Sequence, residues 1–213
     1  MFLPVTLQLL AGFGESLKIF LLTLLFALPL GLVICFGSMS KFSPLRKLTR
    51  CFVWIIRGTP LMLQLIIIFF GPGLMFGMSA LSRFTATIVA FSINYAAYFG
   101  EIYRSGIESM PVGQYEAAEI LGYRPAQTFV HIILPQVIKR VLPALTNELV
   151  TLVKDTSLAF SLAYMEMFTI AKQIAAKETT FIPFVVAGIF YFIFNFVVAA
   201  GMEWVEKRFG YYR

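Results

Sequence analysis

Polar and charged side chains recur at helical spacing inside an otherwise apolar stretch in the middle of the chain. The intervals are four, three, four and three residues, and the positions are Asn94, Tyr98, Glu101, Ser105 and Glu108. At 100° per residue they lie on one face of an α-helix. A charge inside a bilayer costs about 2.5–3.5 kcal/mol by the lower estimates. Such a stripe therefore indicates a path for a polar solute or ion.

A second polar stripe follows about fifty residues later. If the helix there is continuous, one face carries Glu148, Thr151, Asp155 and Glu166. Asp155 and Glu166 are 11 residues apart, about three turns, so they nearly eclipse each other. Lys154 is expected to pair with an acid such as Glu101 or Glu148. The alternative is that these groups only join helices, at about 0.6 kcal/mol per hydrogen bond, and for any single residue both interpretations stay open.

The elements that must position these residues are long apolar helices. A membrane-spanning helix needs about 20 apolar residues, whereas barrel strands alternate over about ten. Uninterrupted apolar runs predict five transmembrane helices, at about Glu15–Met39, Phe52–Gly71, Phe84–Glu108, Leu142–Tyr164 and Phe181–Val205. The fold class is therefore an all-α integral membrane protein.

Composition leads to the same class. Of the 213 residues, 59% are hydrophobic and 13% are charged, whereas soluble domains have about 25% charged residues. A soluble enzyme, a secreted domain and a disordered tail are excluded, because so apolar a chain would aggregate in water. Cys35 and Cys51 form no CxxC pair and are predicted to be apolar packing residues.

Basic residues gather after the first, third and fifth predicted spans, which explains the net charge of +6 without a nucleic-acid partner. The positive-inside rule then places the N-terminus outside and the C-terminus in the cytoplasm. The predicted segments are an interfacial segment (1–14), one transmembrane domain (15–207) with a cytoplasmic loop (109–141), and a cytoplasmic tail (208–213) in which Tyr211 and Tyr212 suit the membrane interface.

The cytoplasmic loop carries the most specific motif of the chain. Residues Glu116–Pro135 read EAAEILGYRPAQTFVHIILP. They predict a short helix, Tyr115–Leu121, ended by Gly122, and a second helix that begins at Pro125, before Pro135 turns the chain back towards the membrane. Two short helices at the membrane surface form a knob that suits the groove of a partner.

This stretch resembles the signature of the permease subunits of ABC importers, which is Glu-Ala-Ala, three residues, Gly, nine residues and Ile-x-Leu-Pro. The chain also resembles the polar amino-acid uptake branch of that family. Three further motifs of the branch are present, namely RGTP at Arg57–Pro60, Glu-Ile-x-Arg-x-Gly-Ile at Glu101–Ile107 and KDTSL at Lys154–Leu158. The four motifs occur in the expected order.

The resemblance implies the type I ABC importer permease fold in the bacterial cytoplasmic membrane. It also implies that the knob is a coupling helix that docks on an ATPase subunit, through Glu116, Ala117, Ala118, Leu121, Gly122 and Pro135. The implied partners are an ATPase dimer, an extracytoplasmic amino-acid-binding protein, membrane lipid, and a second copy or a related permease. No GxxxxGK[ST] phosphate loop occurs in the chain. ATP and Mg are therefore expected on the ATPase, with no cofactor, metal site or enzymatic activity on this chain.

The resemblance further implies a substrate path formed by Asn94, Tyr98, Glu101, Arg104, Lys154, Asp155, Thr156, Ser157 and Glu166. An amino-acid substrate needs acceptors for its ammonium group and donors for its carboxylate. We expect the donors from Asn94, Arg104, Thr156 and Ser157, and the acids favour basic amino acids. The residues Arg57, Gly58, Thr59 and Pro60 are predicted to form a gate or a bend at the pore entrance. Alternatively, Arg57 reaches lipid head groups.

Two other classes of function stay open from the sequence. One is an ATP-independent channel or secondary transporter, and the other is a membrane scaffold that transports nothing. Secondary transporters usually show inverted repeats or paired broken helices, and the sequence shows neither. Five spans are few to enclose a pore, so at least two permease chains are expected, as a homodimer or a heterodimer.

Overall fold

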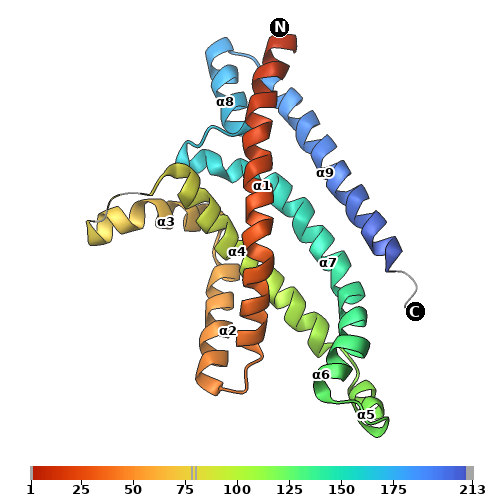
Figure 1. Cartoon of the computed structure of the whole chain (residues 1–213). Coiled ribbons are helices and arrows are strands. Elements are labelled where there is room, and N and C mark those ends of the chain that lie inside the picture. The colour runs from red at the N-terminus through yellow and green to blue at the C-terminus, as the bar shows by residue number, and fades with distance from the viewer. Residues whose placement is uncertain (1, 78, 80, 210–213) are drawn as a thin grey trace.

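The computed structural model describes residues 2–77, 79 and 81–209, and the regular elements of these residues are all helical (Figure 1). Helix α1 (Phe2–Ser38) has 37 residues, or about 55 Å at 1.5 Å per residue. The predicted interfacial segment is therefore no separate element, because residues 2–14 continue the first span in one helix. Gly12 lies inside α1 and lets this helix pack directly against the backbone of Met167.

The predicted second span is two helices rather than one. Helix α2 (Ser43–Gly58) and helix α3 (Leu61–Phe76) meet at an angle of 107°. The reason is Pro60, which has no N–H to donate and forces the residue before it out of the helical region. Thr59 is accordingly extended, with φ −120° and ψ 145°. In Figure 1, α2 runs beside α1 whereas α3 projects sideways.

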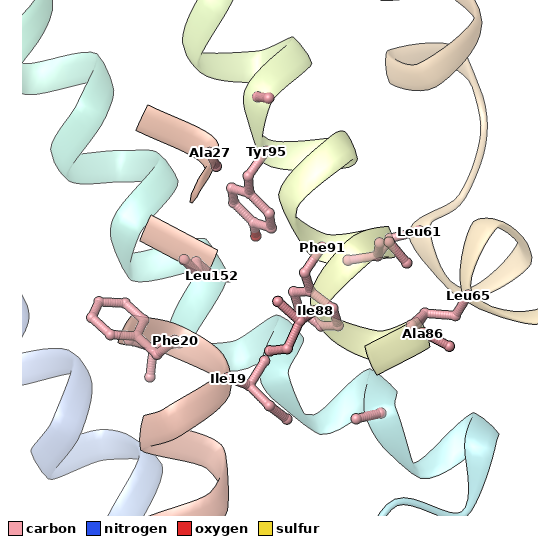
Figure 2. Close-up of a cluster of buried hydrophobic side chains, with 14 of the residues drawn as sticks. Ile19, Phe20, Ala27, Leu61, Leu65, Ala86, Ile88, Phe91, Tyr95 and Leu152 are labelled. Atoms are coloured by element: carbon pink, nitrogen blue, oxygen red, sulfur yellow. The ribbon is translucent and has the colours of Figure 1, made fainter. Parts of the chain in front are cut away.

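Helix α4 (Arg83–Glu108) lies at the centre of the fold and contacts α1, α2, α3 and helix α7 (Leu134–Asp155). Its Phe91 and Tyr95 side chains are almost fully buried. Figure 2 shows them among apolar residues of α1 and Leu152 of α7. Burial of large aromatic side chains fixes the rotation of α4, and this rotation decides which way its polar face points.

The first predicted short helix of the cytoplasmic loop forms as α5 (Val112–Ile120), and a second helix begins at Pro125 as predicted, but its first turn, α6 (Pro125–Thr128), is the start of a longer element. The predicted turn at Pro135 is wrong, because the chain continues from Pro125 to Leu162 as one helical rod. A π-helical turn, η1 (Phe129–Ile133), precedes Pro135. Pro135 lies just after this turn, where the wider π-helical winding accommodates a residue that has no N–H to donate.

Beyond α7 the chain forms a tight 3₁₀ turn, η2 (Thr156–Leu162), followed by helix α8 (Met167–Glu178) and helix α9 (Ile182–Arg208). Helix α8 was not predicted. The predicted tail residues Tyr211 and Tyr212 lie outside the described residues.

The prediction of an all-α membrane protein is confirmed. Among the described residues, α1, the rod at 125–162 and α9 are long and apolar enough to cross a membrane, and α2 with α3 make a fourth if counted as one span. Helix α4, the third predicted span, has 26 residues and is long enough to cross a membrane. It is not among these candidates, because its polar face makes it less apolar than the other long helices.

Candidate functional site

A cavity of about 550 Å³ lies between the α2–α3 bend, α4 and the end of α7. Its wall comes from three separate parts of the sequence, which are brought together by the bend and by the central position of α4. The lining residues are Arg57, Gly58, Thr59, Pro60, Leu61, Asn94, Tyr95, Tyr98, Glu148, Thr151, Asp155 and Leu158. Residues that we predicted as path and as pore entrance thus share one cavity.

The bend is held by Gln64 of α3, which is only 7% exposed. Its amide nitrogen donates to the Ile56 carbonyl oxygen (2.8 Å) and lies 2.9 Å from the Thr59 hydroxyl oxygen. Its amide oxygen accepts a hydrogen bond from Asn94 Nδ2 at 3.0 Å. Gln64 thus satisfies a carbonyl left without a partner where α2 ends and orients the Asn94 side chain. Sequence reasoning missed Gln64, although it is a lone polar residue in an apolar helix.

Asp155 is fixed in the cavity wall by a buried tyrosine. The Tyr95 hydroxyl donates to Asp155 Oδ2 at 2.8 Å. Glu148, two turns earlier on α7, also faces the cavity. Two carboxylates of α7 therefore share the cavity with two donor groups, the guanidinium of Arg57 at the bend and the amide of Asn94 on α4. A cavity with acceptors on one wall and donors on another can bind a solute that carries both charges.

Arg57 points towards α4. Its guanidinium carbon lies 5.0 Å from the centre of the Tyr98 ring, and Nη1 lies 3.8 Å from Glu101 Oε1. Arg57 also lines two smaller cavities beside the first, of about 210 and 410 Å³. These partners on α4 support the interpretation of Arg57 as part of the pore entrance, and the alternative that it reaches lipid head groups stays a prediction because 42% of its side chain is exposed.

Glu101 is paired with arginines. Its carboxylate accepts two hydrogen bonds from Arg104, at 2.5 and 3.0 Å, and Arg104 also binds Glu108. The expected partner Lys154 is exposed and forms no ion pair within 4.0 Å in the part of the chain that the structure describes. The suggested pairing of Lys154 with Glu101 or Glu148 is therefore wrong. Arg104 is held by two acids and is no free donor for a substrate carboxylate.

The segment after Asp155 uses its hydroxyl groups in local hydrogen bonds, and neither Thr156 nor Ser157 is among the residues that line the cavity. Thr156 is fully buried and donates to the Val153 carbonyl (2.8 Å), and Ser157 donates to the Lys154 carbonyl (2.8 Å). Both hydroxyls bond the carbonyl three residues earlier, as is usual where an α-helix tightens into a 3₁₀ turn. The prediction that Thr156 and Ser157 supply donors to the path is not supported by this geometry.

Glu166 does not belong to the second polar stripe. The helix ends at Leu162, and the chain reverses at Ala163, whose φ is +51°. Glu166 is fully buried and caps α8, accepting hydrogen bonds from the backbone N–H groups of Phe168 (2.7 Å) and Thr169 (2.6 Å). Its Oε2 also lies 3.4 Å from hydroxyls of Ser16 on α1 and Tyr191 on α9. It joins three helices and is not among the residues that line the cavity.

Replacement of Glu166 by alanine is expected to lower the stability of the protein by about 2 kcal/mol, because an N-cap and buried hydrogen bonds are lost. Thermal unfolding of the purified protein in detergent measures the loss. Glu178→Ala, at the exposed end of the same helix, is the matched control. Equal unfolding temperatures for the two variants would contradict the capping role.

The knob formed by α5 and α6 projects from the C-terminal end of α4 and the N-terminal end of α7 (Figure 1). Gly122 ends α5 as predicted, with φ +78°, and hydrogen bonds from Gly122 and Tyr123 N–H close the last turn (2.9 and 3.0 Å). Ala118 packs inward, whereas Ile120 and Leu121 are 86% and 73% exposed. Such exposed apolar side chains are typical of a docking surface.

The base of the knob is tied to the two helices that line the cavity. Gln114 of α5 and Gln136 of α7 exchange hydrogen bonds of 2.9 and 2.7 Å. Arg140 of α7 donates to the carbonyl of Ser109 at the end of α4 (2.7 Å). The knob is therefore bonded directly to α7, and α7 is bonded in turn to the end of α4.

Residues 13–211 match the family described as "Binding-protein-dependent transport system inner membrane component". The L-cystine transport system permease protein TcyB of Bacillus subtilis is 35% identical over 200 residues, which cover 92% of this chain and 84% of TcyB. The arginine transport system permease protein ArtQ of the same organism is 33% identical over 201 residues, covering 94% and 91% of the two chains. A crystal structure of an amino acid ABC transporter with histidines has 32% sequence identity and a TM-score of 0.89, covering 98% of both chains.

Proposed function

Since this chain belongs to the family of binding-protein-dependent transport system inner membrane components, we propose that it is the permease subunit of an ATP-driven importer of polar L-amino acids. The predicted all-α permease fold of ABC importers is confirmed by the likeness to the amino acid transporter. The single observation that carries the function is a polar cavity joined through α4 and α7 to an exposed knob.

The cavity supports a zwitterionic substrate. Asp155 and Glu148 provide acceptors for an ammonium group, and Arg57 and Asn94 provide donors for a carboxylate. Tyr98 forms part of the same wall. Among the lining residues two carboxylates face one guanidinium, and this acidic excess supports a preference for basic amino acids. TcyB and ArtQ are described as permeases for L-cystine and arginine.

The bend at Arg57, Gly58, Thr59 and Pro60 acts as a gate in this proposal. Arg57 bridges the cavity and the Glu101–Arg104 pair, so a shift of α4 against α2 would move its guanidinium in or out of the cavity. Such a discrete rearrangement of packed helices is a common form of switching.

The knob provides the coupling. Glu116, Ala117 and Leu121 are exposed on it, where an ATPase subunit could bind. Closure of an ATPase dimer would displace the knob, and the bonds at Ser109, Gln136 and Arg140 would carry that movement to the cavity. ATP and Mg would be bound by the ATPase, and this chain would bind no cofactor and catalyse no reaction.

The chain would lie in the bacterial cytoplasmic membrane with its N-terminus outside and the knob inside. A binding protein would deliver the amino acid from outside, and a second copy or a related permease would complete the pore. The domain bounds 1–14, 15–207 and 208–213 stay predictions with respect to the membrane.

Replacement of Glu116 by lysine, and of Gly122 by valine, is expected to abolish ATP-driven uptake. The first reverses a charge on the docking surface, and the second places a β-branched residue where φ is +78°. The tagged chain is purified from its host in mild detergent, the proteins that co-purify are identified, and uptake of labelled arginine and glutamine into proteoliposomes is measured with ATP.

Recovery of an ATPase with the unsubstituted chain, and its loss with Glu116→Lys, supports the proposal. Glu203→Lys on the exposed surface of α9 is the charge-matched control. Uptake without ATP by the purified chain would favour a channel or secondary transporter. A stable assembly without an ATPase would favour a scaffold.

A further inference from the structure

An apolar groove of about 690 Å³ runs between the end of α1 and α2 and shares no lining residue with the substrate cavity. Its lining is Val33, Ile34, Phe36, Gly37, Ser40, Leu45, Leu48, Thr49 and Phe52. Val33, Phe36 and Leu48 are 67%, 59% and 70% exposed. No function described above uses this surface, and polypeptide does not fill it in the described chain.

Positive charge gathers at one end of the groove. The segment from Met39 to Gly58 holds five basic residues, Lys41, Arg46, Lys47, Arg50 and Arg57, and contains neither Asp nor Glu. Arg46 Nη1 donates to the carbonyl of Ser40 (3.3 Å), a residue of the groove wall. A cationic side chain is thereby held at the mouth of the groove.

The two lysines add charge with no acid beside them. Lys41 and Lys47 are exposed, and neither forms an ion pair within 4.0 Å in the described part of the chain. Arg50 differs, since its guanidinium lies 3.8 Å from Glu108 and also donates to the Ser38 carbonyl (3.2 Å). The unpaired charges are thus those of Lys41, Lys47 and Arg46.

We propose that this groove is a binding site for one phospholipid with a net negative head group. The acyl chain lies along the apolar wall between α1 and α2, and the phosphate lies at Lys41, Arg46 and Lys47. Charge complementarity favours this occupant, because clusters of basic residues beside a membrane-spanning helix attract anionic lipids. An apolar helix of a second permease chain would fit the apolar wall of the groove, but it would leave the basic residues at the end of the groove without a partner.

The test is native mass spectrometry of the detergent-purified complex, titrated with phosphatidylglycerol and with phosphatidylcholine of identical acyl chains. The complex is expected to bind phosphatidylglycerol more tightly. The double variant Lys41→Gln/Lys47→Gln should lose about 30-fold in affinity for phosphatidylglycerol and retain its affinity for phosphatidylcholine. The control Lys172→Gln/Lys177→Gln removes the same charge from α8 and should change neither affinity.

A charge-neutral variant tests the groove itself. The indole of Val33→Trp occupies the groove from the α1 side, where the acyl chain would lie. This variant should lower the affinity for both lipids about equally. An equal affinity of the unsubstituted complex for the two lipids would overturn the proposal. So would an equal loss with the α8 control, or unchanged binding with Val33→Trp.

A second copy in the groove is detected separately. In a Cys51→Ser background, Leu48→Cys would form a disulfide-linked dimer in native membranes if two grooves faced each other. Such a dimer would place protein on this surface and overturn the lipid site, whereas a monomeric thiol that stays reactive agrees with it.

Discussion

Replacement of Gly100 by valine is expected to destabilise the protein by about 3 kcal/mol, at the upper end of the usual cost of overpacking. A Cβ atom at Gly100 would lie 2.7 Å from Ile34 Cγ2 and 3.0 Å from the Gly31 carbonyl oxygen. The second contact is with backbone, which cannot rotate away. Helices α1 and α4 would have to separate, and α4 carries the polar face of the cavity. Thermal unfolding in detergent, followed by size-exclusion chromatography, measures the loss.

Gly188→Val is the matched control for this prediction. Gly188 also lies inside a long apolar helix, α9, but a Cβ atom there meets nothing within 4 Å. Its replacement should leave the unfolding temperature almost unchanged, or raise it slightly because glycine is a poor helix former. Similar destabilisation by both substitutions would show that the close contact of α1 with α4 is not the cause.

The helices could be predicted because their apolar runs are long, and the polar stripe of α4 because its period is maintained through one uninterrupted helix. Asn94, Tyr98, Glu101 and Ser105 all line cavities next to Arg57. The same periodicity argument was wrong for Glu166, since it assumed a helix where the chain tightens and then reverses. Periodicity locates residues on a face only as far as the helix continues.

The bend between α2 and α3 shows a different limit. The motif at Arg57–Pro60 indicated a bend, but the apolar run continues across it, so hydropathy predicted a single span. Hydropathy reports on the solvent that side chains prefer and not on the direction of the helix axis. Helix α8 was missed for the opposite reason, because its exposed face carries Lys172, Gln173 and Lys177 and resembles a loop in composition.

Replacement of Gln64 by leucine is expected to destabilise the protein by about 3 kcal/mol and to reduce uptake at least tenfold. Leucine fits the apolar helix, but it removes the partner of the Asn94 amide and leaves the Ile56 carbonyl with only the Thr59 hydroxyl at 3.4 Å. An unsatisfied buried polar group costs about 1–3 kcal/mol. The bend would then relax, and Arg57 would leave its place in the cavity. Unfolding in detergent and ATP-driven uptake in proteoliposomes measure the two effects separately.

The double variant Gln64→Leu/Asn94→Leu distinguishes packing from transport. It removes the unpaired Asn94 amide as well, so it should be more stable than Gln64→Leu alone. Replacement of both hydrogen-bonding groups by apolar ones destabilises a protein less than leaving one buried polar group unpaired. Uptake should stay low, because the cavity lacks the Asn94 donor and the bend lacks the hydrogen bonds of Gln64. Gln173→Leu on the exposed face of α8 is the control and should change neither quantity. Restoration of full uptake in the double variant would mean that Gln64 only supports the fold and that Asn94 is no part of the path.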